Sequence, residues 1–174
     1  YNPQIARERV AKLRDKVVEY GKQAKLSRLH VLNLADLIAG RIHLTIRLES
    51  RIDVITQIME VSEILAEFLT DLSQYFDIDY YSCTDNHSRV EPDKTQSLDL
   101  ESLCRITDWY LNMRVGQDIN IHENKFGQDI ITLNVLGHNV LGVHGDRDKQ
   151  NNVIEKMTLF TRQSYDLVCT AHLH

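Results

Sequence analysis

Residues 29–38 read LHVLNLADLI, a largely apolar run that carries an acid, Asp36, near its end and is followed by Gly40. Such a run is typical of a strand that is buried in a sheet. Residues 79–83, DYYSC, form a second β-rich run, and residues 51–75 between the two carry apolar side chains at helical spacing. Strand, helix and strand in this order predict an α/β fold, in which parallel strands are joined by a crossover helix.

Further elements are expected on both sides of this unit. A helix over residues 2–24 begins with Asn2 as its cap and Pro3 in its first turn, and two more helices are expected near 99–115 and 151–163. Residues 88–98 are polar and predict a loop. Short strands separated by turns typical of hairpins are expected at 119–121, 130–135 and 139–143, with a last strand at 166–170.

The composition is that of an ordinary globular domain. The 174 residues are 43% hydrophobic and carry a net charge of −5, and no linker or internal repeat divides them. No run of about 18 apolar residues occurs, so we expect no membrane partner. Cys83, Cys104 and Cys169 lie far apart, which favours free thiols in a reducing compartment, the cytoplasm.

The charge is unevenly distributed along the chain. Residues 1–30 hold eight Lys or Arg against three Asp or Glu, a net charge of +5, so the remaining residues carry −10. The basic first helix is a candidate for contact with a phosphate backbone, and its alternative is a plain solvated face. The acidic remainder is compatible with a site that collects cations.

Polar, metal-capable side chains directly follow four of the β-like runs. In α/β sheets, ligands bind beyond the carboxyl ends of the strands, where the loops converge. Imidazole and carboxylate ligands suit Zn, Mn or Fe, and the lack of paired cysteines disfavours a structural zinc knuckle. Each residue alone has an alternative explanation without a ligand, as a helix cap, a turn residue or a terminal histidine. The set consists of Asp36, Asn86 with His87, His144, and His172 with His174.

Four segments resemble, in sequence order, the motifs of the calcineurin-like metallophosphoesterase superfamily. They are residues 34–36 (LAD), 84–87 (TDNH), 142–146 (GVHGD) and 170–174 (TAHLH). The long helices are similar to those of its nuclease-like, phage-type branch. The resemblance implies a metallophosphoesterase-type α/β/β/α sandwich with mixed sheets, incomplete at both ends. Residues 1–174 would then be a single domain from a longer chain. The superfamily's first Asp-x-His motif does not precede the first helix here, so either it lies upstream of Tyr1 or one metal site is incomplete.

The resemblance also implies a role for each matching residue. It implies two divalent transition metals, Mn, Fe or Zn, with Asp36 bridging both of them. His87 would contact the scissile phosphate and either stabilise developing charge or protonate the leaving oxygen. Arg89 and His43 are weaker candidates for substrate binding. The implied ligands are Asp36 for both metals, Asn86, His144 and His172 for the second, and His174 for the first.

The implied activity is hydrolysis of a phosphate ester, with a DNA or nucleotide phosphodiester as the expected substrate. Ser88 stands where the superfamily has an acid, and Ala35, Asp85 and Ala171 stand where it has glycine. These departures favour an alternative, a non-catalytic binding module that keeps the fold with an incomplete metal site. A third alternative is an α/β interaction domain whose histidines are coincidental. The sequence leaves the oligomeric state open.

Overall fold

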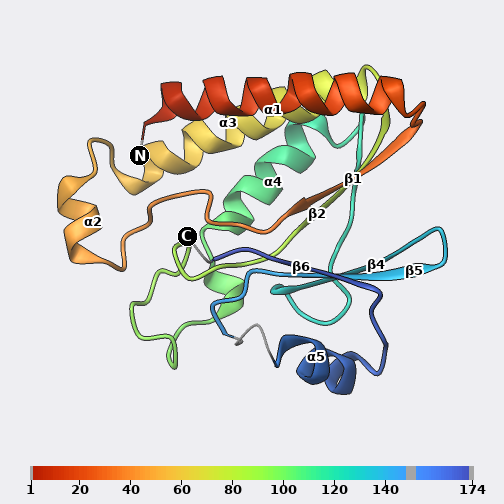
Figure 1. Ribbon diagram of the computed structural model, residues 1–174. Coiled ribbons are helices and arrows are strands. Elements are labelled where there is room, and N and C mark those ends of the chain that lie inside the picture. Colours follow the sequence, from red (N-terminus) through yellow and green to blue (C-terminus); the bar gives the residue numbers. More distant parts are fainter. Residues whose placement is uncertain (1, 148–151, 173–174) are drawn as a thin grey trace.

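A computed structural model describes residues 2–147 and 152–172, which form a mixed α/β fold with two three-stranded sheets (Figure 1). In these residues, no helix is long and apolar enough to cross a membrane. A single 3-10 turn, Asp99–Glu101, precedes α4. The α-helices are α1 (Pro3–Gln23), α2 (Leu44–Glu49), α3 (Val54–Ser73), α4 (Cys104–Val115) and α5 (Val153–Thr161).

The two sheets differ in the direction of their strands. The first has the order β1–β2–β3 and is parallel throughout, so the predicted strand–helix–strand unit is confirmed. The second has the order β4–β5–β6, with β4 antiparallel and β6 parallel to β5. The strands are β1 (Arg28–Asn33), β2 (Asp77–Ser82), β3 (Asn120–Ile121), β4 (Ile130–Val135), β5 (His138–Val143) and β6 (Leu167–Thr170).

The elements are stacked in layers, with α1 and α3 above the first sheet, the second sheet below it, and α5 on the far side (Figure 1). Alternation along the strands explains this stacking, because successive side chains point to opposite faces. Ile78 and Tyr80 of β2 belong to the core that α3 and α4 complete. Tyr81 of β2 instead packs with Leu32 of β1 and Ile131 of β4, which joins the two sheets.

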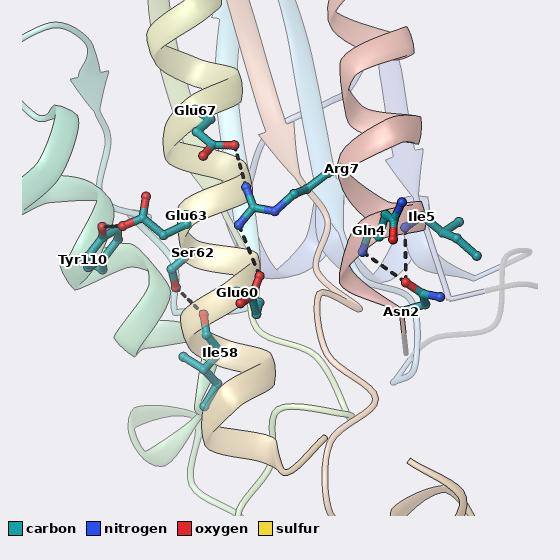
Figure 2. Close-up of polar contacts among 10 residues, drawn as sticks. All are labelled: Asn2, Gln4, Ile5, Arg7, Ile58, Glu60, Ser62, Glu63, Glu67 and Tyr110. Atoms are coloured by element: carbon teal, nitrogen blue, oxygen red, sulfur yellow. Dashed lines mark hydrogen bonds and ion pairs between the residues drawn. The ribbon is translucent and has the colours of Figure 1, made fainter. Parts of the chain in front are cut away.

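The basic helix α1 docks on α3 through ion pairs (Figure 2). The guanidinium of Arg7 lies 3.2 Å from the carboxylate of Glu60 and 2.6 Å from that of Glu67. Arg14 lies 2.6 Å from the carboxylate of Asp71, one helical repeat further along. Part of the positive charge that made α1 a candidate for phosphate contact is therefore used within the molecule.

Several predicted boundaries are wrong. The strand expected over residues 29–38 ends at Asn33, because Ala35 and Asp36 adopt left-handed backbone angles, φ 73° and 54°. The helix expected over 51–75 begins at Val54, after Asp53 caps it by accepting from the amides of Ile55 and Thr56. The short helix α2 was not predicted at all.

Two further expectations are corrected. The helix expected over 99–115 begins at Cys104, since residues 99–101 form the 3-10 turn. The hairpin expected between residues 119–121 and 130–135 does not form, because β3 pairs in parallel with β2 while β4 pairs with β5. The prediction of mixed sheets consequently holds only for the second sheet.

Candidate metal centre

The polar residues predicted at the strand ends lie at the carboxyl ends of both sheets. Asp36 follows the end of β1 and Asn86 the end of β2, whereas His144 follows β5 and His172 follows β6. Asp36, His144 and His172 each offer one ligand atom, and these atoms all lie within 4.8 Å of one another. Asp36 thus meets two histidines that lie more than a hundred residues later in the sequence.

His144 is the best-defined member of this group, with its side chain 1% exposed. Its Nδ1 lies 2.8 Å from the carbonyl oxygen of Leu34, which can only accept a hydrogen bond. Nδ1 therefore carries a proton and donates. The other nitrogen, Nε2, lies 3.0 Å from Oδ1 of Asn86 and 3.4 Å from Oδ1 of Asp36.

Nε2 of His144 is the ring nitrogen left to bind an ion. A neutral imidazole that is protonated at Nδ1 presents a lone pair at Nε2, and that lone pair would face the oxygens of Asp36 and Asn86. A proton or a metal cation resolves this repulsion in a buried place. Carboxylate, amide and imidazole donors together form a set that divalent transition metals accept, so these residues fit such an ion.

His172 approaches from the neighbouring strand. Its ring centroid lies 5.0 Å from that of His144, with the ring planes inclined at 71°. The amide of Ala171 donates to the carbonyl of His144 at 3.0 Å, which ties the loop after β6 to the loop after β5. His172 itself has a left-handed backbone, φ 65°. His174, the other predicted ligand in this segment, lies outside the described residues.

Asp85 has a role that the sequence comparison with the superfamily motif did not reveal. Its side chain accepts from the amide of Asp36 at 2.7 Å and also from the amide of Ser88. It is 5% exposed, so this carboxylate is a buried clamp between the loop after β1 and the turn after β2. A short polar residue between Thr84 and Asn86 was the signal available in the sequence.

His87, the predicted catalytic residue, is oriented by backbone rather than by an acid. Its Nδ1 lies 3.0 Å from the carbonyl oxygen of Ala39, so Nδ1 donates and Nε2 remains for proton exchange. Gly40, which follows Ala39, has φ 73°. A Cβ at Gly40 would lie 2.0 Å from the carbonyl oxygen of His87. The carbonyl of Ala39 therefore fixes which ring nitrogen of His87 carries the proton.

The two weaker substrate-binding candidates lie on opposite sides of His87 in sequence. The ring of His43 is 5.7 Å from the ring of His87, although 44 residues separate them. Nε of Arg89 donates to the carbonyl oxygen of Asn86 at 3.2 Å, which uses part of its guanidinium within the turn. His43 therefore lies near the ring of His87, and Arg89 lies in the turn that carries Asn86 and His87.

Comparison with known proteins adds a distant relative. The chain is similar to the SPbeta prophage-derived uncharacterized protein YonJ of Bacillus subtilis (strain 168), with 26% identity over 179 residues. The alignment covers all of this chain and 44% of the YonJ protein, so the chain spans less than half the length of this relative. No protein family matches the chain. No solved structure matches it either.

Proposed function

We propose that this chain is a metal-dependent phosphoesterase of the metallophosphoesterase type. Asp36, Asn86, His144 and His172 would hold a divalent transition metal, Mn, Fe or Zn, and His174 would contribute to a second. The substrate would be a phosphate ester, with a DNA or nucleotide phosphodiester the best match to the sequence motifs. The mixed α/β fold with two three-stranded sheets supports this proposal at the level of architecture.

One observation carries the proposal. The ligand atoms of Asp36, His144 and His172 gather within 4.8 Å of one another, and Nε2 of His144 lies 3.0 Å from Oδ1 of Asn86 and 3.4 Å from Oδ1 of Asp36. Asp36 supplies an oxygen and the two histidines supply ring nitrogens, and both kinds of atom bind divalent transition metals. A bound cation satisfies all of the donors at once.

The side chains around the site then have distinct tasks. A divalent cation held there supplies Lewis acidity toward the phosphate group. Asp85 holds the backbone of Asp36 against the turn that carries Asn86. His87 has its Nδ1 proton committed to the carbonyl of Ala39, so Nε2 is the atom that delivers a proton to the leaving oxygen.

The proposed setting is the cytoplasm. The cysteines of the chain are all unpaired, and Cys83 and Cys104 are buried in the core. Burial raises the pKa of the Cys104 thiol to about 12, so that thiol stays protonated and unreactive. Unpaired thiols of this kind fit a reducing compartment.

Hydrolysis of bis-p-nitrophenyl phosphate in saturating Mn²⁺ tests the proposal. We expect activity from the unmodified chain and a loss of about 10²- to 10⁴-fold in kcat for His87→Ala, because the leaving oxygen loses its proton donor. The matched control is His138→Ala, since the His138 side chain is 72% exposed on the β4–β5 turn. The control should retain full activity.

The same experiment separates the enzyme from its alternative. If Mn²⁺ binds but the unmodified chain hydrolyses no more diester than Mn²⁺ alone, the phosphoesterase proposal is wrong. The observations then favour the non-catalytic binding module. If His87→Ala is as active as the His138→Ala control, the assignment of the proton to Nε2 of His87 is wrong.

A further inference from the structure

A basic cavity lies beside the turn that carries His87. It has a volume of about 400 Å³ and is lined by the loops on both sides of α2 and by the first turn of α3. Its walls include three arginines, Arg41, Arg47 and Arg51, together with Gly40 and Gln57. Neither the sequence motifs nor the proposed reaction assigns any of these residues a task.

The cavity shares a wall with the site. Gly40 lines it, and a Cβ at Gly40 would lie 2.0 Å from the carbonyl oxygen of His87. Ala39, one residue earlier, provides the carbonyl to which the ring of His87 donates. A ligand in the cavity is therefore close to the residue proposed to act on the scissile phosphate.

None of the three guanidinium groups forms an ion pair with a carboxylate in the part of the chain that the structure describes. Among the described residues, none of Arg41, Arg47 and Arg51 has a side-chain hydrogen bond or an ion pair, whereas Arg7, Arg14 and Arg147 all have carboxylate partners. Asp53 also lines the cavity, but its carboxylate is used in capping α3. Hydrogen bonds from the backbone and hydroxyl of Thr56 lower the pKa of Asp53.

A buried glutamine holds the walls of the cavity together. Gln57 is 1% exposed, and its Oε1 accepts from the amide of Ala39 at 2.9 Å. Its Nε2 donates to the hydroxyl of Ser50 and to the carbonyl oxygen of Ile52, both at 3.0 Å. The loop that follows Asp36 and the loop that precedes α3 are thereby fixed to each other. The cavity that the arginines line is therefore bounded by loops that are fixed to each other. It also reaches the N-terminus of α3, which is the positive end of the helix dipole.

We propose that this arginine pocket binds a second phosphate group of the substrate while the scissile phosphate lies at the metal centre. The inference rests on the proposed function and deepens it. A guanidinium matches the geometry of phosphate oxygens, and three of them around one cavity suit a dianionic or bridging phosphate. The substrate is then a nucleotide strand with several phosphates, rather than a simple phosphate monoester.

Binding of a short fluorescein-labelled oligothymidine to the metal-free protein tests this inference without relying on activity. Arg47→Gln and Arg51→Gln should each weaken binding by about tenfold, because a charged hydrogen bond to phosphate is lost. The slope of log affinity against log salt concentration should fall by about 0.7 for each lost contact. Arg162→Gln is the matched control, since Arg162 is exposed at the end of α5, beyond the second sheet.

Activity provides a second readout. With bis-p-nitrophenyl phosphate, which has a single phosphate, the Arg47→Gln and Arg51→Gln variants should match the unmodified chain. With thymidylyl-thymidine that carries an added terminal phosphate, their KM should rise about tenfold with kcat unchanged. Unchanged affinity for both oligothymidine and inorganic pyrophosphate in both variants overturns the arginine pocket.

Two results distinguish the failures. Arginine-dependent oligothymidine binding without hydrolysis of any ester contradicts the proposed function and leaves the pocket as a nucleotide-strand site. In a second outcome, the substitutions weaken binding of inorganic pyrophosphate but leave oligothymidine binding unchanged. That outcome contradicts the inference that the substrate is a nucleotide strand. Thermal melting of each variant shows whether it remains folded.

Discussion

Ala35 occupies a backbone conformation that usually belongs to glycine. Its φ is 73°, and it lies one residue before Asp36, at one of the positions where the superfamily motif has glycine. An L-residue in this region is strained by about 1–2 kcal/mol, because its Cβ approaches the neighbouring carbonyl oxygen. The strain is located where the chain must turn from β1 toward the candidate metal centre.

Replacement of Ala35 by glycine should stabilise the protein. We expect Ala35→Gly to raise the free energy of unfolding by about 1 kcal/mol, and Tm by about 2–4 °C, as the strain is relieved. Ala171→Gly is the matched control, since the motif also has glycine there but the backbone of Ala171 has no positive φ. The control should lower stability by about 0.5–1 kcal/mol. Equal effects of the two changes on Tm would contradict this account.

At the scale of residues, the placement of Asp36, Asn86, His144 and His172 at strand ends could be predicted from the sequence. Each follows an apolar run, and the carboxyl ends of strands share an edge. The clamp formed by Asp85 could not be predicted, because it depends on a backbone amide 49 residues away in sequence. The carbonyl of Ala39 was equally hidden, since a backbone acceptor has no signature in the sequence.

A polar cluster crosses the first sheet on the face opposite the helices. Asp79 of β2 lies between β1 and β3, and its side chain is 7% exposed. Its carboxylate accepts from Nε2 of His122 at 2.7 Å and lies within 3.6–3.7 Å of Arg28 and His30. Burial alone would raise the pKa of Asp79, but the hydrogen bond from His122 and the nearby positive groups outweigh it and lower the pKa.

This cluster predicts a pH-dependent contribution to stability. A lowered pKa means that the folded state favours the carboxylate, so the stabilisation is complete at neutral pH and is lost as the pH falls through the folded pKa, below 3.8. Asp79→Asn should therefore cost about 1–3 kcal/mol at pH 7 and progressively less as the pH falls toward and below 3. Asp77→Asn, an exposed position on the same strand, should have little effect at either pH. Melting curves that show the same Asp79→Asn deficit at both pH values would disprove the linkage.

At the scale of elements, periodicity predicted the long helices and most strands. The helix and strand boundaries that were predicted wrongly depend on information outside the local sequence pattern. The start of α4 shifted because Asp99–Glu101 form a separate turn, and β3 is only two residues long and is held by its pairing with Tyr80 and Asp79. Pairing partners of a short strand are decided by tertiary contacts, which a hairpin-like spacing does not encode.

At the scale of the whole molecule, the site exists because two sheets present the carboxyl ends of their strands at a shared edge. Gly142 of β5 permits this approach, since a Cβ there would lie 3.2 Å from side-chain atoms of Leu32 and Leu34. The sequence predicted the strand–helix–strand unit but not that the first sheet would be parallel throughout. The two sheets pack against each other through a core cluster that includes Tyr81 and Ile131. This packing brings together the loops that carry Asp36 and His144.

The metal content of the protein, measured by elemental analysis after incubation with Mn²⁺ or Zn²⁺ and exhaustive dialysis, tests the central proposal most directly. We expect at least about one metal ion per chain, and a loss of most of it in Asp36→Asn, which removes the anionic ligand with almost no change in size. His138→Ala should keep its metal, and circular dichroism should show that both variants are folded. A folded, unmodified chain that retains no metal, or an Asp36→Asn variant that retains as much as the unmodified chain, would contradict the account.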